Sequence, residues 1–84
     1  MKYTDLEEII NWISQKIVEL TGVEMPAIEA DRNILEYGLD SLRSINLVGQ
    51  IELRLGKDIP VTTILDHPTI RSLAHFIREQ AAIA

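Results

Sequence analysis

Aliphatic residues recur at helical spacing in three separate segments of this chain, and that periodicity constrains its fold more than any other feature. In the first segment, apolar residues stand at i, i+3, i+4, i+7, i+11 and i+14 from Leu6, which is the spacing of one helical face. The pattern predicts a helix over about 5–20. Thr4 and Glu7 occupy the positions of a capping box before it, and Gly22 provides its end.

The second segment predicts a helix over about 41–55 that is apolar around most of its circumference. Its seven aliphatic residues cover far more than one narrow stripe: Leu42, Ile45, Leu47, Val48, Ile51, Leu53 and Leu55. A chain of 84 residues has room for only one small core, so this helix cannot be enclosed completely. Some of these side chains, with Leu42 first among them, must face solvent, a ligand or a partner.

The third segment predicts a helix over about 70–82, with Thr69 as its N-cap, and a short turn over 63–66 precedes it. Residues 22–40 lack sustained periodicity, and we expect an ordered connection there with one short turn near Ile34. The predicted fold is all-α: a small four-helix bundle with three main helices and one short helix. A long loop joins the first two helices, and residues 1–84 form a single domain.

Composition excludes several classes of function. The chain has no cysteine, so it can form neither a disulfide nor a thiolate metal site. A net charge of −5 argues against binding to nucleic acid, which needs clustered Lys and Arg. The sequence has no apolar run of membrane-spanning length and no signal-peptide pattern, so we expect a soluble cytoplasmic monomer that does not bind membranes.

Acidic residues crowd the stretch before Ser41, and two interpretations of them remain open. They could form a surface for partners with basic patches, by complementarity of charge. They could equally be the solvated face of a loop. The five residues are Glu24, Glu29, Asp31, Glu36 and Asp40.

We find no set of residues that predicts catalysis or metal binding. His67 and His75 lie near or in the last predicted helix, and neither of these remote histidines can be assigned as the base partner of a serine. His75 and Glu79 stand at i, i+4, a spacing that is typical of a surface pair. We therefore expect a non-catalytic protein without a metal site.

The most informative motif is G-L-D-S-L at residues 38–42. It places the hydroxyl of Ser41 at the N-terminus of the broadly apolar helix, after a glycine and an acid. Serine at such a position is often only an N-cap. A phosphate on this hydroxyl would lie beside free backbone N–H groups and the positive end of the helix dipole. The residues alone are compatible with either role.

With their neighbours, these residues resemble a known family. Residues 31–42 (DRNILEYGLDSL) resemble the phosphopantetheine attachment site of acyl carrier proteins. Residues 65–74 (LDHPTIRSLA) resemble the segment through which the carrier domains of polyketide synthases enter their last helix. The predicted helices follow the order of that family, so the resemblance extends over almost the whole chain.

The resemblance implies that Ser41 carries a 4′-phosphopantetheine arm. A separate phosphopantetheinyl transferase would donate the arm from coenzyme A, and the terminal thiol of the arm would hold acyl groups as thioesters. Further implied partners are an acyltransferase and a ketosynthase, or acyl-activating enzymes. Asp40 and Leu42 resemble the flanking residues that partners recognise, and we add Arg43 to this recognition set.

Two details favour a polyketide-type carrier. Arg43 follows the motif and Glu52 is the only acid in the second helix, unlike the acidic second helix of fatty-acid carriers. Asp40 after Leu39 departs from the G-G-x-S form of peptidyl carriers. A peptidyl or aminoacyl carrier and a helical adaptor without a prosthetic group remain as alternatives.

The surplus of aliphatic side chains also leads to a prediction about cargo. We expect the bundle to take up part of an apolar acyl chain between Ile45, Val48 and Leu65. Because a close-packed core resists opening, we expect this uptake to be weak or partial.

Overall fold

The computed structural model of the protein describes residues 5–82, in which four α-helices are joined by a long loop and shorter connections. The main helices are α1 (Leu6–Thr21), α2 (Ser41–Leu55) and α4 (Ile70–Ala82), and the short helix is α3 (Thr63–Asp66). The predicted all-α fold is therefore confirmed, with the bounds of each helix within one residue of the prediction. Two 3-10 turns lie in the long loop, η1 (Met25–Ala27) and η2 (Ile34–Tyr37). The second was predicted, whereas the first, which contains Pro26, was not.

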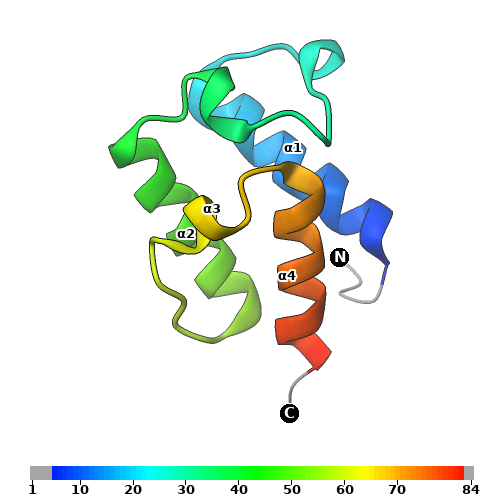
Figure 1. Cartoon of the computed structure of the whole chain (residues 1–84), viewed down its shortest axis with the longest axis vertical. Helices are drawn as coiled ribbons and strands as arrows, with labels where there is room; N and C mark the ends of the chain where they lie inside the picture. Colours follow the sequence, from blue (N-terminus) through cyan, green and yellow to red (C-terminus); the bar gives the residue numbers. More distant parts are fainter. Residues whose placement is uncertain (1–4, 83–84) are drawn as a thin grey trace.

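The helices pack around one aliphatic core. α1 packs chiefly against α4 and also contacts α2, while α3 lies against α2 (Figure 1). The predicted apolar stripes supply the most deeply buried side chains, as periodicity requires. The largest fully buried residues include Ile9, Ile13, Ile17, Ile34, Leu47, Ile51, Ile70, Leu73 and Ile77.

The start of α1 differs slightly from the predicted capping box. The Asp5 carboxylate accepts hydrogen bonds from the backbone N–H groups of Glu7, at 3.0 Å, and Glu8, at 3.4 Å. Asp5 is therefore the N-cap residue, and the helix begins at Leu6. Thr4, which the capping box required, lies outside the described residues.

Hydrogen bonds to the start of α4 hold the long loop in place. The backbone N–H of Ile34 donates to the carbonyl of Pro68 at 2.8 Å, and the N–H of Arg71 donates to the carbonyl of Ala30 at 2.9 Å. The Arg71 side chain also contacts the Asp31 carboxylate at 2.8 Å. Figure 1 shows the loop crossing one end of the bundle, above α4. The predicted ordered connection is thus confirmed, and its anchor is α4.

A buried tyrosine folds the loop back on itself before α2. The Tyr37 hydroxyl accepts from the N–H of Glu29 at 2.7 Å and donates to the carbonyl of the same residue at 3.1 Å. Gly38 follows with φ of 84°, a left-handed conformation that glycine adopts without steric cost. This turn directs the chain into α2 and fixes where that helix begins.

None of the helices within residues 5–82 combines the length and the apolar character that crossing a bilayer requires.

Candidate functional site

The N-terminus of α2 is capped by Asp40. Its Oδ1 atom accepts from the backbone N–H of Arg43 at 2.9 Å, and its carbonyl accepts from the N–H of Ser44 at 2.8 Å. Ser41 is therefore the first residue of the helix and not its cap. Of the two roles that the sequence allowed for Ser41, the capping role is wrong, because the neighbouring carboxylate performs it.

The Ser41 side chain is exposed, and its hydroxyl makes no hydrogen bond with any residue of the described chain. It lies in the first turn of a helix of 15 residues, where backbone N–H groups lack intrahelical acceptors. The positive end of the helix dipole favours negative charge at this position. A phosphate ester on this oxygen would meet a favourable field without displacing any existing contact.

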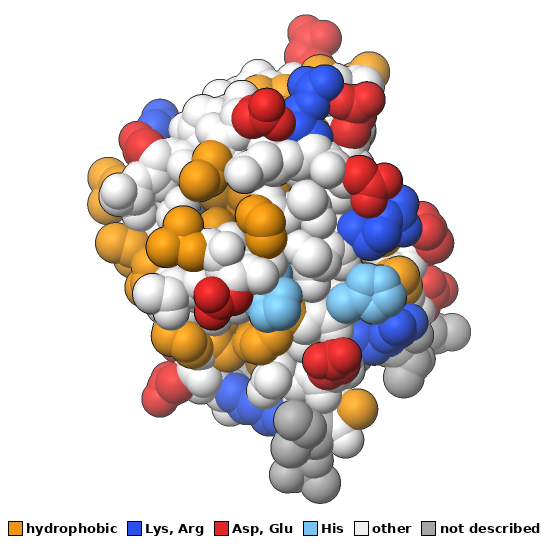
Figure 2. All heavy atoms as spheres, viewed as in Figure 1, with side chains coloured by type: hydrophobic (Ala, Val, Ile, Leu, Met, Phe, Trp, Pro, Cys, Tyr) orange, Lys and Arg blue, Asp and Glu red, His pale blue; other side chains and the backbone are white. Residues whose placement is uncertain are grey.

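An apolar groove begins beside Ser41. It is a hollow of about 450 Å³ between η2, α2 and α3, and its polar lining residues are Asp40, Ser41, Ser44 and Thr62. We call it the Ser41 groove. Figure 2 shows hydrophobic side chains gathered on this side of the molecule, over α2 and α3, while charged side chains lie mainly elsewhere. The apolar residues that line the groove are Leu35, Leu39, Ile45, Val61, Ile64 and Leu65.

The structure brings together most of the residues that the sequence singled out. Leu42 is 76% exposed next to Ser41, as the surplus of apolar surface on α2 predicted. Ile45 and Leu65 are exposed and line the Ser41 groove. Val48 is buried in the core and does not line the groove, so an acyl chain could reach it only if the groove deepened.

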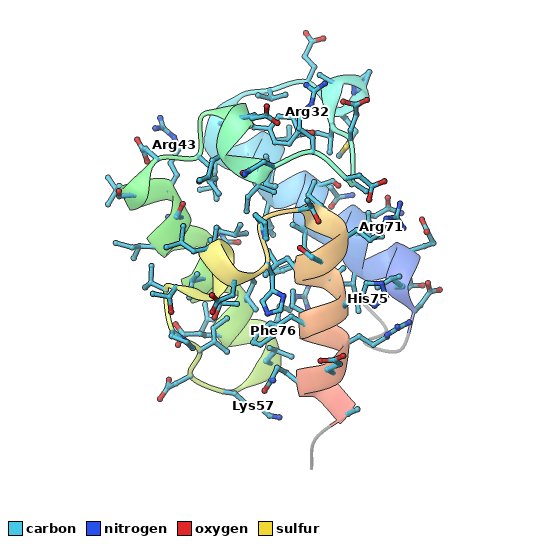
Figure 3. All side chains as sticks on the ribbon, viewed as in Figure 1. Arg32, Arg43, Lys57, Arg71, His75 and Phe76 are labelled. Atoms are coloured by element: carbon cyan, nitrogen blue, oxygen red, sulfur yellow. The ribbon has the colours of Figure 1, made fainter. Side chains whose placement is uncertain are left out.

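Arg43 makes contacts that sequence reasoning missed. Its Nε atom donates to the carbonyl of Leu20 in the last turn of α1 at 2.7 Å, and the Nη1 atom of the same guanidinium group contacts the Asp40 carboxylate, also at 2.7 Å. Figure 3 shows Arg43 at the start of α2, apart from Arg32 of the loop and Arg71 of α4. Leu20 and Arg43 are 23 residues apart, so no local pattern could have indicated this contact.

The acids before Ser41 do not act as one uniform surface. Glu29 pairs with Arg32, and Asp31 pairs with Arg71 of α4. Glu24 and Glu36 are exposed. Part of this charge therefore holds the loop together, and the rest is solvated.

Neither histidine is among the residues that line the Ser41 groove, and both have local contacts. The ring of His67 packs against Phe76 of α4, with 4.9 Å between ring centroids. The Nδ1 atom of His75 lies 3.1 Å from a guanidinium nitrogen of Arg78, and not against Glu79. Within residues 5–82, His, Asp and Glu side chains do not gather in groups of three or more that could hold a metal ion.

Comparisons with known proteins agree on one family. Residues 11–77 match the family described as "Phosphopantetheine attachment site". The erythronolide synthase EryA3 of Saccharopolyspora erythraea is 31% identical over 88% of this chain. The non-reducing polyketide synthase AC of Didymella fabae is 40% identical over 71% of it. The chain spans only 2% of the length of each of these synthases.

Two solved structures share the fold. The HMG-ACPI domain of the CurA module from Lyngbya majuscula superimposes with a TM-score of 0.83 at 25% identity, covering 90% of this chain and 77% of that domain. A free-standing peptidyl carrier protein from Acinetobacter baumannii gives a TM-score of 0.85 at 26% identity. That alignment covers 92% of this chain and 96% of the other.

The local geometry fits the prosthetic group of this family. The Ser41 hydroxyl has no competing partner in the described chain, and the apolar groove beside it offers a surface for an extended arm. The family match covers most of the chain. The chain therefore belongs to the phosphopantetheine attachment site family, whose carrier domains bear a covalently attached 4′-phosphopantetheine.

Proposed function

We propose that the Ser41 hydroxyl is the attachment point of the arm and that the chain is a non-catalytic acyl carrier. The observation that carries this proposal is the exposed hydroxyl at the first turn of α2, which makes no hydrogen bond in the described chain and belongs to a residue that lines an apolar groove. When bound, the arm supplies a terminal thiol on which acyl groups are held as thioesters. The chain itself supplies the hydroxyl, the field of the helix and the groove.

Ser41 has no general base among its described contacts, which supports a non-catalytic role. A serine hydroxyl is a weak nucleophile unless a neighbouring group takes its proton. The nearest carboxylate in sequence, that of Asp40, is already engaged by Arg43 through both of its oxygens. Activation of Ser41 must therefore come from the phosphopantetheinyl transferase.

Partner recognition is proposed at the start of α2. Leu42 presents a large exposed aliphatic side chain beside Ser41, and exposed aliphatic groups of this kind are suited to protein contacts. We assign Asp40 and Leu42 to recognition by the transferase and by acyl-transferring enzymes. The similarity to polyketide synthases favours an acyltransferase and a ketosynthase among them. We propose that residues 1–84 form one monomeric carrier domain that acts in the cytoplasm, where coenzyme A is available.

The Ser41 groove is the proposed contact surface for cargo. Ile45 and Leu65 would meet the first methylenes of an acyl chain, and each methylene buried contributes about 0.8 kcal/mol. Val48 would take part only if the core opened, which close packing resists. We therefore propose partial uptake along the groove.

The direct test is incubation of the protein with coenzyme A and a broad-specificity phosphopantetheinyl transferase. We expect the intact mass to rise by one arm, and fragmentation to locate the added mass on Ser41. No change in mass, or an arm on Ser14, Ser44 or Ser72, would contradict the proposal.

A peptidyl or aminoacyl carrier is the second candidate. The free-standing peptidyl carrier protein of Acinetobacter baumannii matches over 96% of its own length, so this fold also serves that class. Mass spectrometry of the thioester on protein isolated from its native host distinguishes the two classes. An acyl group without an amine supports the polyketide-type carrier, whereas an aminoacyl group supports the alternative.

A further inference from the structure

Arg43 joins the end of one helix to the start of another. The last turn of α1 contains no basic residue, so α1 itself places no positive charge near its last carbonyl groups. Arg43 supplies that charge from 23 residues further along the chain, by donating from Nε to the Leu20 carbonyl at 2.7 Å. An arginine near the C-terminus of a helix can satisfy a terminal carbonyl in this way.

The same guanidinium group also fixes the residue before Ser41. It donates to Oδ2 of Asp40 at 2.7 Å, while the backbone N–H of Arg43 donates to Oδ1 at 2.9 Å. Both oxygens of the carboxylate are therefore engaged on one side of the helix start. The Ser41 hydroxyl makes no hydrogen bond to this carboxylate in the described chain.

We propose that Arg43 is a positioning residue for the modification of Ser41. It clamps the Asp40 carboxylate and the start of α2 against the end of α1, so that the Ser41 hydroxyl stays free and fixed in place. This inference rests on the proposed role of Ser41. It differs from the role in partner recognition predicted from the sequence, in which Arg43 acts as a charge that an enzyme reads.

The geometry distinguishes a clamp from a simple charge. The guanidinium group donates in two directions at once, to a carbonyl of α1 and to a carboxylate of the α2 cap. Lysine carries the same charge on a single nitrogen and cannot reproduce a fork of donors. Replacement of Arg43 by Lys therefore preserves the charge and removes the clamp.

The chain offers a matched control in Arg32. Arg32 pairs with Glu29 at the same i, i+3 spacing, with side chains 48% and 60% exposed against 47% and 56% for Arg43 and Asp40. The Arg32 side chain makes no hydrogen bond to α1 in the described structure. Exposed ion pairs of this kind contribute little to global stability, so R32K and R43K should both remain folded.

The first measurement is the kinetics of modification of the unmodified protein by transferase and coenzyme A. For R43K we expect kcat to fall about tenfold, because displacement of a reacting group slows the reaction. We expect KM to stay within about twofold, since contacts made equally in binding and reaction are retained. R43Q should behave like R43K, and R32K like the parent protein. Parent-like kcat in R43K, or a salt-dependent rise confined to KM, would overturn the clamp and favour recognition of charge.

The second measurement needs no modification. In ¹H–¹⁵N spectra of the parent protein, the Nε–H of Arg43 should exchange slowly with water because it is bonded to Leu20. In R43K and R43Q the backbone amides of residues 43 and 44, which donate to Asp40, should exchange faster than in the parent protein. A rapidly exchanging Nε–H in the parent would overturn the clamp. Failure of the parent to gain an arm on Ser41 would instead overturn the proposed function, so the two failures are distinguishable.

Discussion

The chain contains two Ser-Leu pairs near the start of a helix, and the structure uses them in opposite ways. At α4, the Ser72 hydroxyl accepts from the Thr69 N–H at 3.0 Å, and the Thr69 hydroxyl accepts from the Ser72 N–H at 3.0 Å. Leu73 is then fully buried. At α2, the Ser41 hydroxyl has no such bond in the described chain, and Leu42 is 76% exposed.

The position within the helix explains the difference. Ser72 follows the N-cap by three residues, from which a side chain can reach back to the cap residue and complete a reciprocal pair. Ser41 directly follows the cap, and the carboxylate of Asp40 already satisfies the helix start. The same dipeptide therefore packs its leucine into the core at the start of α4, whereas at the start of α2 it exposes both its hydroxyl and its leucine to solvent.

The largest expected effect is on the modification itself. S41A should gain no arm in the presence of transferase and coenzyme A, because it lacks the acceptor oxygen, while its free energy of unfolding should change by less than about 0.5 kcal/mol. S72A should gain a full arm. Intact-mass measurement of both variants shows which serine carries the arm. A full arm on S41A would show that Ser41 is not the attachment point.

The two leucines should separate stability from recognition. L73A should lower the free energy of unfolding by about 2–5 kcal/mol, since it removes a fully buried side chain. L42A should cost far less, yet it should lower kcat/KM for modification. Urea denaturation and transferase kinetics measure the two effects. A large loss of stability in L42A would place Leu42 among the residues that hold the core together.

The cap of α4 should contribute less to the free energy of unfolding than the buried Leu73 does. T69A removes the hydroxyl that accepts from Ser72 and should cost about 0.5–2 kcal/mol of stability. T69S keeps the hydroxyl and should recover most of that loss. Both variants should still be modified on Ser41, because the cap of α2 is a separate group. Equal stability of T69A and the parent protein in urea would show that the reciprocal pair contributes nothing.

The smallest expected effect concerns cargo. Loading of a long acyl group should shift the amide signals of Ile45 and Leu65, which line the Ser41 groove, relative to protein that carries an acetyl group. Leu73 provides an internal reference and should not shift. Changes confined to the immediate neighbours of Ser41 would contradict uptake along the groove, and a shift at Val48 would show that the groove deepens into the core.

The local sequence pattern was sufficient to predict most of the fold. The bounds of α2, α3 and α4 agree with the ranges predicted, because each has a strong apolar repeat or clear Gly and Pro boundaries. The exposure of Leu42 was also predictable, since α2 carries more apolar surface than a small core can bury. The beginning of α1 shifted by one residue because Asp5 provides the cap.

Contacts between distant segments were not predictable. The Leu20 carbonyl and the Arg43 side chain meet only after α1 and α2 have packed. The assignment of Val48 to the core also depends on the rotation of α2 about its axis, which α1 and α4 determine. At the cap of α2, Asp40 and Ser41 are both favourable residues, and the turn at Gly38 decides between them.

The anchoring of the long loop to α4 has a consequence for the order of events during synthesis. Backbone hydrogen bonds join Ala30 to Arg71 and Ile34 to Pro68. The ion pair between Asp31 and Arg71 joins residues that are 40 positions apart. Contacts of such separation form only after the intervening chain has closed, at a cost in entropy. A nascent chain that ends before Pro68 lacks these bonds and carries Ser41 after an unanchored loop. Attachment of the arm should therefore follow completion of α4, and ribosome-bound fragments that stop short of it should be poor substrates for the transferase.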